Sequence, residues 1–170
     1  ADSEGLDAVT LTRVALLLGV RQPALYRHID SYDALVRALG LRGREILASR
    51  LGEAAVGLAG DDAVRAMGRA WRAMGGDHPG LYAATDRYPC AGDAELEEAV
   101  ERVVAVLGQA LVAYGLADVD RVHAARSMRS ALHGFAHLES ALDNFLLCLK
   151  RMPDGSGTAR ASALAVCRLW

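Results

Sequence analysis

The stretch GVRQPALYRHIDSYDALV, residues 19–36, decides the fold. It opens with a glycine that follows an apolar segment, and Pro23 and a cluster of polar and aromatic side chains come next. Gly19 suits the end of a helix because glycine adopts the left-handed conformation without strain. Pro23 suits a first helical turn, where a missing N–H loses no partner. The stretch therefore predicts a tight turn followed by a short helix that runs to about His28.

The segments on either side of this stretch also have helical patterns. Before it, Leu11, Val14, Ala15 and Leu18 are spaced as on one face of a helix, and Thr10 can cap that helix. After it, Ser31 is a plausible N-cap of a helix that reaches about residue 55.

The rest of the chain alternates helical patterns with short breaks. A helix is expected from residue 61 or 62 through Met74, and a glycine-rich break and a short helix at 81–85 follow it. A loop at 89–93 precedes a helix from Ala94 to Tyr114, which Gly115 closes. Helices at 119–142 and 142–150, a loop at 152–158 and a last helix at 159–170 complete the prediction. Because no segment alternates with a period of two, the predicted fold class is all-α.

Composition limits the classes of function. The 170 residues are 52% hydrophobic and carry a formal net charge of −2, so any surface for nucleic acid must be local. Such a surface could lie between residues 21 and 50, where the sequence has six arginines and only three acidic residues. The three cysteines lack CxxC spacing and are expected to be thiols in a reducing cytoplasm. No apolar run is long enough to predict a membrane span.

Two helices joined by a tight turn describe a helix-turn-helix, whose second helix enters the major groove of DNA. Gln22 offers both a donor and an acceptor, as base reading requires. An ordinary helical hairpin with a polar outer face has the same spacing, so spacing alone leaves both interpretations open.

The residues themselves favour one of them. LTRVALLLGVRQPALYRHIDSYDALVRAL, residues 11–39, closely resembles the DNA-binding segment of the TetR family of bacterial transcriptional regulators. The resemblance extends from Leu6 to about Leu47, and its GV-x-x-x-x-LY-x-H core is specific. It implies a helix-turn-helix head at residues 1–47 and a helical ligand-binding and dimerisation body at 48–170.

The resemblance also implies a set of DNA contacts. They are Thr10, Thr12, Arg13, Gln22, Pro23, Ala24, Tyr26, Arg27, His28 and Tyr32. Tyr32 stands where many members carry a phosphate-binding lysine, although its hydroxyl can still donate to phosphate. The family's first helix should precede Gly5, and little of it is expected within residues 1–4. The head is therefore expected to be less stable than the body.

The body carries a weaker resemblance. DHPGLYAATDR and MRSALHGFAHLESA are similar to the family's tryptophan-histidine-glycine class, with Met128 or Arg129 where tryptophan is usual. The family dimerises through its last two helices, which implies a homodimer. The candidate interface residues are Ala131, Phe135, Leu138, Leu142, Phe145 and Leu149. Each of them could instead belong to the core of a single chain.

An effector pocket is expected between the body helices. Its candidate residues are Met67, Trp71, Met74, Tyr82, Val104, Leu107, Leu111, Met128 and His133. Methionines suit such a pocket because their side chains adapt to varied shapes. A methionine or tryptophan stripe at helical spacing can equally be core.

Catalytic and metal sites are not expected. His133 and His137 are four residues apart on a predicted helix and could share a metal, but the sequence shows no third ligand. Nucleophile-elbow and phosphate-loop motifs are absent from the sequence, and no cofactor is expected. The predicted function is a cytoplasmic, dimeric repressor that leaves operator DNA when a small, largely apolar molecule binds. The alternative is a dimeric helical small-molecule-binding protein without a DNA function.

Overall fold

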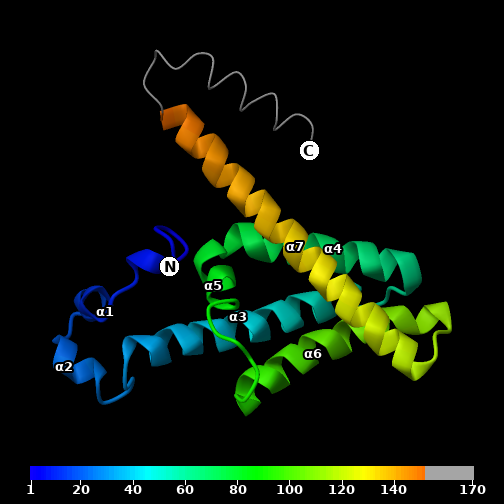
Figure 1. Cartoon of the computed structure of the whole chain (residues 1–170), viewed down its shortest axis with the longest axis horizontal. Helices are drawn as coiled ribbons and strands as arrows, with labels where there is room; N and C mark the ends of the chain where they lie inside the picture. The colour runs from blue at the N-terminus through cyan, green and yellow to red at the C-terminus, as the bar shows by residue number, and fades with distance from the viewer. Residues whose placement is uncertain (152–170) are drawn as a thin grey trace.

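The computed structural model describes the backbone of residues 1–151 and the side chains of residues 1–139. In that part of the chain all regular structure is helical, which confirms the all-α prediction (Figure 1). The elements are η1 (Leu6–Ala8), α1 (Leu11–Leu17), α2 (Gln22–Leu25), α3 (Tyr32–Ala55), α4 (Gly60–Asp77), α5 (Pro79–Ala84), α6 (Ala94–Ala110), η2 (Leu111–Tyr114) and α7 (Asp118–Arg151). None of the helices in the described residues combines the length and apolar character needed to cross a membrane.

The head consists of α1 and α2, and its turn chemistry agrees with the sequence. The Thr10 side chain accepts a hydrogen bond from the Arg13 amide, 3.2 Å away, and so caps α1. Gly19 has φ of 67°, in the left-handed region that glycine tolerates best. One detail was predicted wrongly. Helix α2 ends at Leu25, short of His28.

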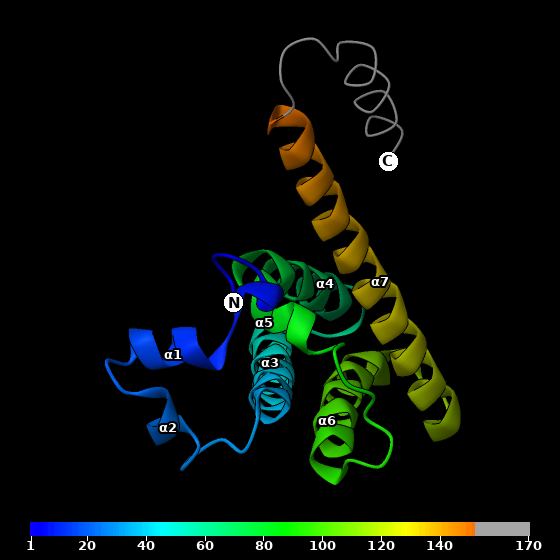
Figure 2. The same ribbon diagram turned by 60° about the vertical axis from the view of Figure 1, so that its left-hand side comes forward.

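Helix α3 connects the head to the body. Ser31 caps it, with Oγ accepting from the Ala34 amide at 3.0 Å, and the helix reaches Ala55 as predicted. Figures 1 and 2 both show α1 and α2 at the N-terminal end of α3, apart from α4, α6 and α7. Because α3 passes residue 47 without a break, the division of the chain at that residue remains a prediction.

Helix α5 packs closely on α3. A Cβ atom added at Gly40 would lie 2.6 Å from the Ala84 carbonyl oxygen, and one added at Gly43 would lie 2.8 Å from the Thr85 methyl carbon. Real Cβ atoms essentially never come so close, and at Gly40 the neighbouring atom belongs to the backbone and cannot rotate away, so this position requires glycine. The two glycines therefore fix α5, and the turn after it, against the helix that carries the head.

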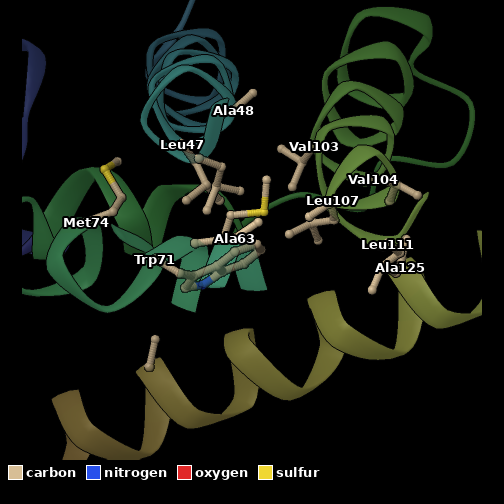
Figure 3. Packing of buried hydrophobic residues seen from close by; sticks show 14 of the residues in the cluster. Leu47, Ala48, Ala63, Trp71, Met74, Val103, Val104, Leu107, Leu111 and Ala125 are labelled. Atoms are coloured by element: carbon tan, nitrogen blue, oxygen red, sulfur yellow. The ribbon is translucent and has the colours of Figure 1, made fainter. Parts of the chain in front are cut away.

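The body is built around one hydrophobic core. Leu47 from α3, Trp71 from α4 and Leu107 from α6 converge in it (Figure 3). Many of its side chains have at most 2% of their surface exposed, among them Leu51, Met67, Trp71, Met74 and Leu107. Helix α7 closes the core with Ala125 and Ala136. Burial on this scale is the main source of stability in a domain of this size.

The last two helical patterns form a single helix. Helix α7 runs from Asp118 to Arg151 without a break at Leu142, where two segments were expected to meet. The chain enters it through η2 and Gly115, which has φ of 66°. The predicted loop at 152–158 and helix at 159–170 lie outside the described residues.

Candidate functional site

The predicted DNA contacts lie mainly on the outer surface of the head. Seven are exposed, and Gln22, Ala24 and Tyr32 are half-buried. The Thr12 hydroxyl donates to Gln22 Oε1 at 2.9 Å, which links α1 to α2. Gln22 Nε2 lies 3.5 Å from the Tyr26 hydroxyl oxygen. These contacts hold the polar end of Gln22 in place, as a residue that reads bases requires.

Two of the predicted contacts also have structural partners. Arg13 forms an exposed ion pair with Glu4, which competes with a phosphate for the same guanidinium. The Tyr32 ring packs against both small hydrophobic clusters of the head, around Leu25 and Val36. Tyr32 therefore contributes to the packing of the head, in addition to the phosphate contact predicted for it.

The predicted effector residues lie together in the body. Met67, Trp71, Met74, Tyr82, Val104, Leu107 and Leu111 are all buried in the single core cluster, and Met128 packs against it. A cavity of about 20 Å³ is lined by Trp71, Tyr82 and His133 among others. That volume is close to what one water molecule occupies. A second cavity, of about 210 Å³, lies between α6 and α7 and includes Val104 and Ala125.

A chain of polar contacts leads from the core to the surface beside the small cavity. Trp71 Nε1–H donates to the Tyr82 hydroxyl at 2.8 Å, and that hydroxyl lies 2.7 Å from His133 Nδ1. His133 Nε2 is 2.9 Å from Asp86 Oδ1. His137 Nε2 also contacts the Asp86 carboxylate, from the other side. Asp86 was missed in the sequence because it lies in the turn after α5, far from both histidines along the chain.

The surroundings of Tyr82 and Asp86 determine whether these two side chains are ionised. Burial raises the pKa of Tyr82 to about 12, so its hydroxyl stays neutral and can take part as a donor. Burial alone would raise the pKa of Asp86, but hydrogen bonds and charge interactions with His133 and His137 lower it below its usual range. Asp86 is therefore ionised at neutral pH.

The turn that carries Asp86 is anchored to α3. Arg44 is 6% exposed, donates to the Thr85 carbonyl oxygen and lies 3.3 Å from Cys90 Sγ. A buried guanidinium needs such partners because an unpaired charge in the interior is costly. Arg44 thus connects the α5 turn to the helix that begins at the head.

The predicted dimer residues lie on the outer face of α7. Ala131 is exposed, and Phe135 and Leu138 have 57% and 58% of their surface accessible. Earlier on the same helix, Ala124 and Met128 pack on the core instead. The side chains of Leu142, Phe145 and Leu149 lie outside the described residues.

Fold and surface together define a helix-turn-helix protein with an attached helical body. Comparison with known proteins supports this class. The family described as the tetracyclin repressor-like C-terminal domain matches residues 64–154. The helix-turn-helix-type transcriptional regulator Rv0681 of Mycobacterium tuberculosis is 39% identical over 139 residues, which are 81% of this chain and 64% of that protein. This chain therefore spans somewhat less than two thirds of the length of that relative.

One further relative and one solved structure support the same class. YobS of Bacillus subtilis, another helix-turn-helix-type transcriptional regulator, is 30% identical over 81% of this chain and 72% of its own length. The Streptomyces coelicolor protein ActR, crystallised with actinorhodin, has the same fold, with a TM-score of 0.56 and 22% identity over 94% of this chain and 77% of its own. The chain belongs to the TetR family of transcriptional regulators. Its place in the tryptophan-histidine-glycine class remains a prediction.

Proposed function

We propose that the protein is a ligand-responsive repressor that binds operator DNA as a homodimer in the cytoplasm. The observation that carries this proposal is the polar surface of α2, held by Thr12 and attached to the body through the unbroken helix α3. The helix-turn-helix regulators among its relatives favour this function over the alternative without DNA, and over an enzyme.

The dimer would form through the outer face of α7. Phe135 and Leu138 expose large apolar surfaces one helical turn apart. Apolar side chains exposed together on one face are typical of an interaction surface. A two-fold interface would place two α2 helices at the spacing of successive major grooves, as dimeric helix-turn-helix proteins require.

The effector is proposed to be a small, largely apolar molecule that enters the body near Trp71 and Tyr82. Those side chains are tightly packed, so such a molecule would have to separate them. It would stabilise whichever body conformation gives α2 the wrong spacing for DNA, since a ligand shifts an equilibrium only by its difference in affinity for the two states. The complex of ActR with actinorhodin supports a small-molecule effector by analogy.

The test uses the full-length protein and a duplex selected by it from a random library. We expect Gln22→Ala to weaken binding by about 1–3 kcal/mol, because a bidentate base contact is lost. Tyr26→Ala should also weaken binding. Gln109→Ala, at an exposed glutamine of α6, is the matched control and should leave affinity unchanged. Unchanged anisotropy titrations for both Gln22→Ala and Tyr26→Ala would refute the assignment of α2 to DNA.

A further inference from the structure

Two imidazoles and a carboxylate meet at the junction of the α5 turn and α7. His133 and His137 are four residues apart on α7, so both rings lie on the same side of the helix. Asp86 reaches them from the turn after α5. One donor atom from each of the three residues lies within 4.8 Å of the other two. The carboxylate that the sequence alone could not identify thus completes a set of three possible ligands.

We propose that Asp86, His133 and His137 form a binding site for a divalent first-row transition metal of the zinc or cobalt class. Two imidazole nitrogens and one carboxylate oxygen are the donors that these ions prefer, whereas magnesium and calcium prefer oxygen alone. Both histidines direct Nε2 towards the same carboxylate. This convergence is the feature that distinguishes the group from an ordinary ion pair.

The distances require only a small adjustment to admit an ion. Zinc binds nitrogen and oxygen at about 2.0–2.2 Å, which places neighbouring ligand atoms of a tetrahedral site roughly 3.3–3.5 Å apart. His133 Nε2 and Asp86 Oδ1 are 2.9 Å apart and would separate slightly. The His137 side chain is 47% exposed and that of Asp86 36%, so rotation of either is possible without repacking the core.

The surroundings of His133 suit a metal ligand. Its Nδ1 faces the Tyr82 hydroxyl at 2.7 Å, and that hydroxyl is itself held by Trp71. A metal-ligating histidine usually places its second ring nitrogen on such a partner, which fixes the ring and its tautomer. With Nδ1–H donating to the Tyr82 oxygen, the lone pair of Nε2 would face the ion. In a neutral His133 ring the single proton would then sit on Nδ1, so a ring that otherwise holds it at Nε2 would change tautomer when the ion binds.

The site would be open on one side. Three protein ligands leave a fourth position for water or for a donor atom of another molecule, as in zinc sites that are not purely structural. An ion here would join α7 to the α5 turn, which Arg44 and the two α3 glycines hold against the connecting helix. This inference does not rest on the proposed DNA function, because its test measures the metal alone.

The test is a titration of the chelator-treated protein with Co²⁺, followed by visible absorption, with Zn²⁺ as competitor. We expect one site per chain. Asp86→Asn and His137→Ala should each weaken Co²⁺ binding about 100-fold or more, because each removes a proposed ligand. Removal of a residue that only hydrogen-bonds a metal ligand typically costs about 10–100-fold. Tyr82→Phe should weaken Co²⁺ binding about 10-fold.

Two histidines supply matched controls. His123 lies exposed on the same helix, and His78 pairs with Asp2 at 2.9 Å but has no second imidazole beside it. His123→Ala and His78→Ala should bind Co²⁺ as the unmodified protein does. Circular dichroism checks that each variant folds, and His137→Ala, at an exposed residue, keeps the test valid if Asp86→Asn does not fold. Equal affinity of His137→Ala and the unmodified protein, or no binding by the latter, would overturn the proposal.

Discussion

The head and the body of this protein are held together by very different amounts of buried apolar surface. The body has one cluster of fifteen buried residues drawn from α3, α4, α5, α6, η2 and α7. The head has two clusters of three, and one of these borrows Ala84 from α5. Since apolar burial is the main term that offsets chain entropy, the body should fold on its own core while the head depends on its neighbours.

The exposed leucines of the head also indicate that it buries less apolar surface than the body. Leu16, Leu17 and Leu18 are 78%, 81% and 64% exposed. A cavity of about 420 Å³ in the head is lined by Leu17, Val9, Val14 and Leu35 among others. The difference teaches that, within the described residues, opening the head should cost less free energy than opening the body, because less apolar surface would be exposed.

The largest expected effect of a single substitution lies in the body core. Trp71→Ala should lower the free energy of unfolding by about 3–5 kcal/mol, because a fully buried aromatic side chain is removed and leaves a cavity. Leu17→Ala in the head is the control and should change it by less than about 0.5 kcal/mol, as at other exposed positions. Urea unfolding followed by circular dichroism compares the two. Similar losses would mean that the cores do not differ as described.

The next effect concerns the outer face of the body. Phe135→Glu should weaken dimerisation by about 2 kcal/mol or more, because a charge would be buried at a central contact of the proposed interface. Val119→Glu introduces the same charge at an exposed valine elsewhere on α7 and should leave the dimer intact. Sedimentation equilibrium measures both. A stable Phe135→Glu dimer would place the interface on another surface.

A smaller effect is expected where α5 meets α3. Gly40→Ala should destabilise the protein by about 1–3 kcal/mol, because its methyl group would collide with the Ala84 carbonyl oxygen. Gly52→Ala, on the same helix with open space around it, should be neutral or stabilise by up to about 1 kcal/mol through helix propensity. Thermal unfolding of the pair gives the comparison, and equal midpoints would show that the joint tolerates a side chain.

Local signals made much of the fold predictable. The caps at Thr10 and Ser31 and the turn at Gly19 depend on residues close in sequence, and the structure confirms all three. The division predicted at Leu142 was wrong, because α7 continues through that residue and neither glycine nor proline lies there to end the helix. The early end of α2 at Leu25 was also not predicted, because the local spacing suits a helix that continues to His28.

The candidate sites, like the fold, could be predicted only in part from the sequence. The predicted effector residues do lie together in the core, since a stripe on one helix face packs inward as a unit, and this arrangement also agrees with the alternative that they are core alone. Asp86 could not be predicted, because only the packing of the α5 turn against α7 brings it to the two histidines. The dimer face remains a prediction from the family resemblance, and the structure adds that Phe135 and Leu138 are exposed while Met128 packs on the core.

Hydrogen exchange measured by mass spectrometry tests the contrast between head and body most directly. Slow exchange reports the free energy needed to open each segment, so it compares the two regions within one molecule. Amides in residues 11–29 should exchange much faster than those in residues 100–111, whose helix supplies Val103, Val104 and Leu107 to the core. Equal protection of the two segments would contradict the account, because it would show that the head is as stable as the body.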